Sequence, residues 1–325
     1  MPKIKVVFAK PLGFCFGVKR ALRLTLNARK KTKAGPVITF GELIHNPQVL
    51  SELRRSGIVS VENLNELSRY NVKDNPAVVI RSHGCAPEIK EAIKKMGFNI
   101  IDATCPTVRR VSKFAQVFSK KGYFVVIVGN KDHPEVKGIL GHVKDQKCIA
   151  VYHAKLPQIL RRNEVKKLVL LAQTTITKEE FLSAIKKFDF AEFDEIKIIN
   201  TLCKEAQLRQ RSCQNLKNHV ELIIVIGGRN SANTKSLYKL ASGARSKVIQ
   251  ITKSQELIKN KVVRKMLSES QHELKVGIIS GASTPIEAVA EVVTTIKALA
   301  QETPAGSGNK FFKSHFKEVI NNNEC

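Results

Sequence analysis

The chain has 325 residues, of which 43% are hydrophobic, 26% charged and 6% aromatic, and its formal net charge is +27. One ordinary domain holds about 100 to 200 residues, so this length predicts two or three domains. The composition is that of a globular α/β protein and excludes a disordered or fibrous chain.

The N-terminal stretch is interrupted by Lys10, Pro11 and Gly13, which is not typical of a signal peptide. No apolar run reaches the roughly 18 residues that a membrane-spanning helix needs. We therefore expect a cytoplasmic protein with no membrane partner.

The positive charge is spread over the body of the chain, because residues 301–325 carry three Lys and three Glu. Such a field attracts anions, among them nucleic acid, phosphorylated small molecules and acidic redox proteins. Basic clusters interleaved with stacking aromatic residues are missing, which disfavours nucleic acid.

Six apolar, β-branched runs are typical of buried parallel strands. They lie at 6–9, 77–80, 123–128, 167–172, 221–226 and 275–279. Helical stretches at 112–122, 179–188 and 234–244 stand between them, and this alternation predicts βαβ units. Each run after the first ends in small and polar residues, and ligands bind at that edge of an open parallel sheet.

Three of the seven cysteines recur in register with these polar strand ends. From Cys15 it is 30 residues to His45 and 68 to His83; from Cys105, 28 to His133 and 69 to Thr174; from Cys203, 28 to Ser231 and 80 to Ser283. The cysteines themselves are 90 and 98 residues apart. One unit therefore occurs three times, as a cysteine followed by two polar strand ends.

This repeat predicts three similar α/β domains with small parallel sheets, arranged about a pseudo-threefold axis around a central Fe-S cluster. The expected boundaries are 1–16 for an N-terminal strand and the first cluster ligand, 17–104, 105–202 and 203–288 for the three domains, and 289–325 for a C-terminal helix and tail.

The three repeated cysteines are candidate metal ligands, because cytoplasmic thiols stay reduced and do not build a disulfide framework. A cubane cluster usually takes four thiolates, so three leave one iron open to substrate. Widely spaced cysteines are also common as small buried hydrophobes, and it is the register that favours a cluster. Four cysteines lie at no repeated position and are predicted to be structural or exposed thiols: Cys85, Cys148, Cys213 and Cys325.

The polar strand ends predict a shell that hydrogen-bonds phosphate oxygens, helped by the helix N-termini that follow. Its members are His45, His83, His133, Thr174, Ser231, Asn233 and Ser283. The sequence has no phosphate-binding P-loop and no GxGxxG, so we expect a small phosphorylated ligand and no nucleotide. Glu135 could deliver protons to that ligand, or it could be a loop acid paired with Lys131 or Lys137.

The segments GFCFGVKRA, IHNP, RSHG, DATCPTV, HPEVKG, QTT, TLC, RQ, NSANT and SGAST resemble the 4-hydroxy-3-methylbut-2-enyl diphosphate reductase family, from about Cys15 to Pro285. The resemblance implies a trefoil-shaped oxidoreductase that uses two electrons and two protons to remove an allylic hydroxyl as water. Its products would be isopentenyl and dimethylallyl diphosphate, made in the last step of the non-mevalonate isoprenoid pathway.

The resemblance also implies residue roles. Cys15, Cys105 and Cys203 would bind one 4Fe-4S cluster with an open iron, and Glu135 would donate protons. The substrate would contact His45, His83, His133, Thr174, Ser231, Asn233 and Ser283. Electrons would come from an acidic protein, reduced ferredoxin or flavodoxin, which the positive charge would attract.

The chain departs from the family pattern in two places. Ala232 replaces a serine of an NSSNT-like segment, which removes one possible phosphate hydrogen bond, and KEAQLRQ follows Cys203 where the family tends to have an Ala-Thr pair before Arg-Gln. Two other hypotheses are compatible with the sequence. One is a structural or regulatory metalloprotein that uses the three cysteines to bind zinc or a redox-sensing cluster and its positive charge to bind nucleic acid. The other is a cluster-free transferase acting on phosphorylated metabolites.

Overall fold

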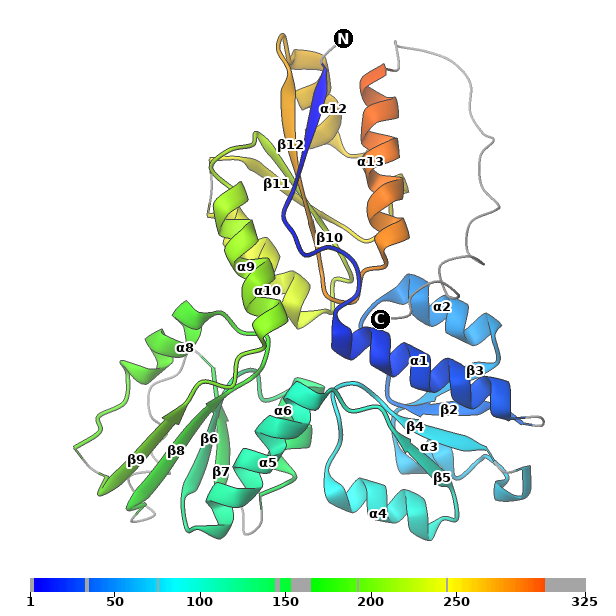
Figure 1. Ribbon diagram of the computed structural model, residues 1–325, viewed down its shortest axis with the longest axis vertical. Helices are drawn as coiled ribbons and strands as arrows, with labels where there is room; N and C mark the ends of the chain where they lie inside the picture. The colour runs from blue at the N-terminus through cyan, green and yellow to red at the C-terminus, as the bar shows by residue number, and fades with distance from the viewer. Residues whose placement is uncertain are drawn as a thin grey trace.

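The structure is a computed structural model that describes residues 3–32, 35–74, 76–143, 147–152, 165–191, 193–243 and 245–301. These residues form three four-stranded sheets, and all strand pairs within them are parallel. Figure 1 shows the sheets in three lobes around a shared centre. The predicted α/β fold with three small parallel sheets is confirmed.

The first sheet lies between Cys15 and Cys105 in the sequence. Its spatial order is β3-β2-β4-β5, with β2 at Val37–Phe40, β3 at Ile58–Val61, β4 at Ala77–Ile80 and β5 at Asn99–Asp102. Its helical segments are α1 (Phe16–Lys31), α2 (Pro47–Arg55), α3 (Leu64–Leu67), the 3-10 turn η1 (Val72–Asp74) and α4 (Pro87–Lys95). Both α2 and α4 begin with proline, whose fixed φ suits the first helical position.

The second sheet repeats this order as β7-β6-β8-β9. Its strands are β6 (Phe124–Val128), β7 (Cys148–Val151), β8 (Lys167–Ala172) and β9 (Glu195–Ile199). Its helices are α5 (Pro106–Lys120), α6 (Pro134–Leu140) and α8 (Lys178–Ile185). A capping box between Thr177 and Glu180 satisfies the first N–H groups of α8 and fixes where it begins.

The third sheet joins the two ends of the chain. Its order is β1-β12-β10-β11, with β1 at Ile4–Phe8, β10 at Leu222–Ile226, β11 at Lys247–Ile251 and β12 at Leu274–Ser280. Its helices are α9 (Lys204–Leu216), α10 (Ala232–Ser242), α11 (Gln255–Ile258), α12 (Lys261–Glu269) and α13 (Ile286–Gln301).

The N-terminal strand β1 takes the edge position that β5 and β9 hold in the other two sheets. Each of these three edge strands leads into one of the repeated cysteines: β1 into Cys15, β5 into Cys105 and β9 into Cys203. The cysteines therefore lie at the three junctions between lobes, which is the arrangement that a pseudo-threefold repeat requires.

The inner strands are buried on both faces. In β6, Val126 packs in one apolar cluster with Leu170 of β8, while Val125 and Ile127 pack in a second cluster on the opposite face. Successive side chains of a strand point to opposite faces, so a sheet covered by helices on both sides needs apolar residues at every position. This requirement explains the uninterrupted apolar runs in the sequence.

All six predicted strands are confirmed, as β1, β4, β6, β8, β10 and β12, and the three predicted helices correspond to α5, α8 and α10. The prediction missed β2, β3, β5, β7, β9 and β11, most of which are short edge strands with a partly exposed face. The predicted tail beyond residue 301 lies outside the described residues, and the domain boundaries stay a prediction. In the described part of the chain, no helix has both the length and the apolar character to cross a membrane.

Candidate active site

Each repeated cysteine is the N-cap residue of a long helix, Cys15 of α1, Cys105 of α5 and Cys203 of α9. The backbone N–H of each cysteine donates to a carbonyl just beyond the end of β12, β4 or β8. Cys15 donates to Ala282 at 3.0 Å, Cys105 to Ser82 at 2.9 Å, and Cys203 to Thr174 at 2.9 Å. The regular spacing of the cysteines in the sequence therefore corresponds to a hydrogen bond that recurs at equivalent places in the three lobes. Helix N-termini carry partial positive charge, which favours thiolate.

The three thiols converge on the centre of the molecule. A Cβ on Gly17 would lie 2.6 Å from the Sγ of Cys105 and 3.9 Å from the Sγ of Cys15, so this position has no room for a side chain. Cys203 interacts electrostatically with Cys105 and with Cys15. Burial raises the pKa of the Cys15 and Cys203 thiols, and the neighbouring thiols raise it further.

The thiols fit a multinuclear cluster better than a single ion. Among the described residues, the His, Cys, Asp and Glu side chains close enough together to hold one ion are His45, His83 and His133, and the cysteines are not in that set. One zinc ion would need every sulfur at about 2.3 Å. A cluster instead distributes its thiolates over several irons, so three free, half-buried thiols at separate helix ends suit it.

Three histidines from two lobes form a compact group. The ring centroids are 4.5 Å apart for His45 and His83, 5.9 Å for His45 and His133, and 5.5 Å for His83 and His133. Burial lowers the pKa of all three, to about 4 for His133 and well below the usual range for His83. The rings are therefore neutral near pH 7.

Two ring nitrogens of this histidine group lack a hydrogen-bond partner among the described residues. Nε2 of His45 and Nδ1 of His83 are buried and have no hydrogen bond from any described residue. A buried polar atom left in this state costs about 1 to 3 kcal/mol, which a ligand could recover. In His133, Nδ1 accepts from the N–H of Glu135 at 3.2 Å, so the neutral ring carries its proton on Nε2 and can donate it to a ligand.

Two hydrogen bonds within the second lobe hold Glu135. Its carboxyl is buried, with the residue 2% exposed, and Oε1 accepts from the Thr174 N–H at 2.7 Å while Oε2 accepts from Thr174 Oγ1 at 2.8 Å. Burial raises the pKa of Glu135, and the two hydrogen bonds oppose that rise. The Glu135 charge also acts on Cys203, so this acid lies near the thiols.

The loop-acid alternative for Glu135 names an ion pair with Lys131 or Lys137. Among the described residues, no ion pair joins Glu135 to Lys131 or Lys137, and Lys137 lies 4.0 Å from Asp132 instead. A buried carboxyl bound by neutral donors is the arrangement expected of a functional acid.

The third lobe contributes the predicted serines and asparagine. Ser231 caps α10, accepting from the Thr234 N–H at 3.3 Å, and Ser283 Oγ donates to the His45 carbonyl at 3.2 Å. Asn233 is 4% exposed, and neither of its amide atoms has a partner among the described residues. This lobe therefore meets the first lobe beside the histidines and presents further unpaired polar atoms.

Four further residues of the site were not predicted from the sequence. The positive charges of Arg81 and Lys235 act on the histidines. Arg81 is the first residue of the RSHG motif, and Lys235 follows the NSANT motif. Asn46, which is 1% exposed, caps α2 and donates to the Ser283 carbonyl at 2.8 Å. Arg209 is buried behind the Cys15 loop. The motifs gave a signal for each, but the contacts depend on how the lobes meet.

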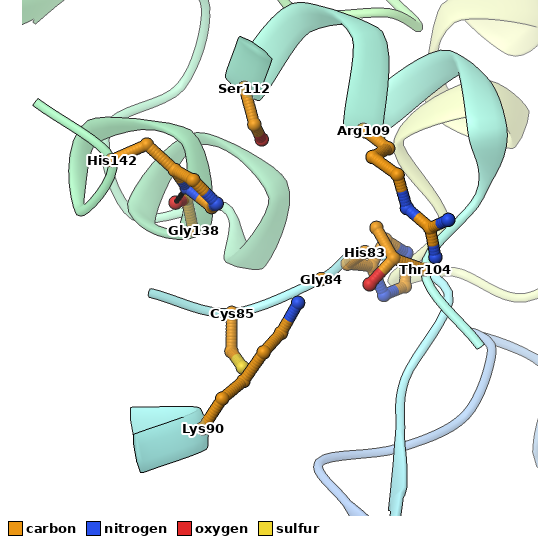
Figure 2. Close-up of a pocket in the computed structure, with 9 residues that line it drawn as sticks. All are labelled: His83, Gly84, Cys85, Lys90, Thr104, Arg109, Ser112, Gly138 and His142. Carbon is orange, nitrogen blue, oxygen red and sulfur yellow. Dashed lines mark hydrogen bonds between the residues drawn. The ribbon is translucent and has the colours of Figure 1, made fainter. Parts of the chain in front are cut away.

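A separate small cavity lies between the first and second lobes (Figure 2). It is lined by His83, Gly84, Cys85, Lys90, Thr104, Arg109, Ser112, Gly138 and His142. Its volume of about 20 Å³ is enough for about one water molecule. Of the predicted ligand shell, His83 is the one residue that lines this cavity. Cys85, which lies two residues from His83, lines this cavity.

The comparisons with known proteins match almost the whole chain. A model of the family described as LytB protein matches residues 6–297. The chain belongs to the LytB protein family. This LytB protein is 35% identical over 298 residues to the 4-hydroxy-3-methylbut-2-enyl diphosphate reductase of Aquifex aeolicus (strain VF5), with 92% of the chain and 98% of the relative covered. The enzyme of the same name from Kosmotoga olearia is 31% identical over 296 residues, with 90% and 95% covered.

Two solved structures share the fold of this LytB protein. One is a structure of (E)-4-hydroxy-3-methyl-but-2-enyl diphosphate reductase, described as the terminal enzyme of the non-mevalonate pathway, with a TM-score of 0.65, 34% identity and 92% and 100% of the two chains covered. The other is the E-1-hydroxy-2-methyl-but-2-enyl-4-diphosphate reductase of Plasmodium falciparum, with a TM-score of 0.77, 25% identity and 90% and 88% covered.

Proposed function

We propose that this LytB protein is a 4-hydroxy-3-methylbut-2-enyl diphosphate reductase of the non-mevalonate isoprenoid pathway. The reaction removes the allylic hydroxyl as water, takes up two electrons and two protons, and releases isopentenyl and dimethylallyl diphosphate. One observation carries the proposal: three converging thiols lie near a buried carboxyl, in a chain 35% identical over nearly its full length to an enzyme of that name.

The proposed cofactor is one 4Fe-4S cluster bound by Cys15, Cys105 and Cys203, with one iron left open. When bound, the cluster supplies electrons and a Lewis-acidic iron for the substrate hydroxyl. The chain contributes three thiols at helix N-termini and, at Gly17, the space that a side chain would fill.

The proposed binding group for the diphosphate is made of neutral polar side chains set in a positive field. Neutral His133 can donate from Nε2, and neutral His83 can donate from its unpaired Nδ1. In neutral His45, Nδ1–H donates to Glu42 Oε2 at 3.3 Å, so its unpaired Nε2 is an acceptor that suits a hydroxyl of the ligand. Arg81 and Lys235 add positive charge around the rings, which attracts the anion without requiring a charged histidine. The other proposed contacts are Thr174, Ser231, Asn233 and Ser283.

Glu135 is the proposed proton donor. Burial raises its pKa, so the carboxyl keeps its proton to a higher pH than an exposed glutamate would. Thr174 holds both carboxyl oxygens and so fixes the direction in which the proton can be transferred. Its proximity to Cys203 puts the acid beside the metal ligands, where the leaving hydroxyl would need a proton.

The proposed electron donor is reduced ferredoxin or flavodoxin, acting in the cytoplasm. The formal net charge of +27 supports an acidic partner, because opposite charge raises the association rate. Salt screens such attraction, so donor-dependent turnover should fall with ionic strength more steeply than turnover driven by a small neutral reductant.

The test is anaerobic turnover of 4-hydroxy-3-methylbut-2-enyl diphosphate with a reduced dye, with the diphosphate products identified. Cys105→Ala should lose iron and activity, whereas Cys148→Ala should keep both. The Cys148 thiol is half-buried near the Leu140 carbonyl and does not belong to the three converging thiols of Cys15, Cys105 and Cys203. Equal iron loss in the two variants, or a wild-type protein that holds iron and leaves the substrate unchanged, would contradict the proposal.

A further inference from the structure

Arg209 belongs to the RQ segment of α9, and the proposed reaction gives it no role. Its side chain is 1% exposed. Nη1 donates to the Pro11 carbonyl at 2.8 Å and the Ser280 carbonyl at 3.1 Å, and Nη2 donates to the Gly13 carbonyl at 2.8 Å. Pro11 and Gly13 lie in the loop that leads into Cys15. One guanidinium therefore joins the helix that begins after Cys203 to the loop of another proposed ligand.

These carbonyl partners leave the charge of Arg209 unbalanced. The nearby carboxylate of Glu205 is 3.9 Å from Nη2 and belongs to a side chain that is 42% exposed, so solvent weakens this pair. Nε is buried and has no hydrogen-bond partner among the described residues. A guanidinium buried against neutral carbonyls alone is costly, and a negative charge nearby would offset that cost.

The proposed cluster ligands supply such a negative charge. Arg209 interacts electrostatically with Cys15 and Cys203 as well as with Glu205. Each electron added to a cluster held by thiolates makes the centre more negative. A fixed buried cation stabilises the reduced form more than the oxidised form, because net charge near a cluster is one determinant of its reduction potential.

We propose that Arg209 is a positioning residue whose buried positive charge balances the cluster and raises its reduction potential. This inference rests on the proposed function, since it requires the cluster. The step concerned is the transfer of one electron from an external reductant to the cluster, with no bond made or broken. Arg209 acts through Cys15 and Cys203.

The test is an anaerobic redox titration with dithionite, followed by visible absorbance and electron paramagnetic resonance. Arg209→Gln should lower the ratio of reduced to oxidised cluster at least tenfold at a fixed solution potential, which corresponds to about 59 mV for one electron. Arg209→Lys keeps the charge and should stay within about threefold of wild type. Arg211→Gln removes the same charge from an exposed position of the same helix and should also stay within that range.

The possible outcomes separate charge from shape. An unchanged potential in Arg209→Gln with full iron content would overturn the proposal, and so would equal drops in Arg209→Gln and Arg209→Lys, which would assign the effect to the hydrogen bonds. If Arg209→Gln retains no iron, the iron content of Arg209→Lys decides: full loading supports the charge, and equal loss overturns it. A wild-type protein without iron would instead refute the proposed function.

Discussion

Glu135→Gln removes one acidic proton and keeps the contacts that hold the side chain. The glutamine Oε1 can accept from the Thr174 N–H, and Nε2 can donate to Thr174 Oγ1, in place of the present bonds of 2.7 and 2.8 Å. A positioned general acid contributes about 100- to 10,000-fold to a rate, or about 3 to 5 kcal/mol of barrier. We therefore expect kcat to fall by about 100-fold or more while the cluster content and KM change little.

The assay is anaerobic turnover of the diphosphate substrate with a reduced dye, beside iron analysis and the visible spectrum of each variant. Asp132→Asn is the matched control, because this exposed acid lies in the loop just before α6 and contacts Lys137 rather than the site. It should keep the wild-type rate. Turnover of Glu135→Gln within about threefold of wild type, with the cluster intact, would refute the role of Glu135 as proton donor.

Gly17→Ala should lower iron content without destabilising the helix, because the new Cβ would meet the Sγ of Cys105 at 2.6 Å while alanine favours a helix by about 1 kcal/mol; full iron content would contradict the close approach. Thr174→Val should move the alkaline limb of the pH–rate profile to higher pH, because it removes a hydrogen bond that lowers the pKa of Glu135. An unmoved limb would show that the ionisation of Glu135 does not cause it. The pKa of His133 is lowered to about 4, so its contribution to the free energy of unfolding should fall by about 1.4 kcal/mol per pH unit as the pH falls from about 6.5 to about 4. Chemical denaturation of His133→Asn should show a shallower slope, and an equal slope would contradict the burial of a neutral ring.

The sequence predicts five of the six inner strands, β4, β6, β8, β10 and β12, because they are apolar runs buried on both faces. It misses the sixth, β2, whose apolar run is interrupted by Thr39. An apolar run such as 222–226 has one explanation in a sheet covered by helices, and it is β10. The edge strand β9 has the sequence EIKII with a partly exposed face, so it lacks this signal. The place of β1 beside β12 could not be read from the sequence, since that pairing joins segments about 270 residues apart and depends on closure of the whole trefoil.

In the candidate site, too, the features that depend on local sequence were predicted and those that depend on contacts between distant segments were not. The register of the cysteines reflects a repeated local structure, a cysteine that caps a helix after an edge strand, so spacing alone could find it. The contacts of Arg209 could not be predicted from spacing, because its partners Pro11 and Gly13 lie in a distant segment of the chain. The loss of a phosphate contact at Ala232 stays a prediction.

The most direct test of the central claim is metal analysis of the protein purified without oxygen. Three converging thiols with one iron left open predict a brown protein with about four irons and four sulfides per chain and absorbance in the visible Fe-S region. The Cys15→Ala, Cys105→Ala and Cys203→Ala variants should each lose that iron. A colourless protein that carries zinc, or a brown one whose iron survives all three substitutions, would contradict the account.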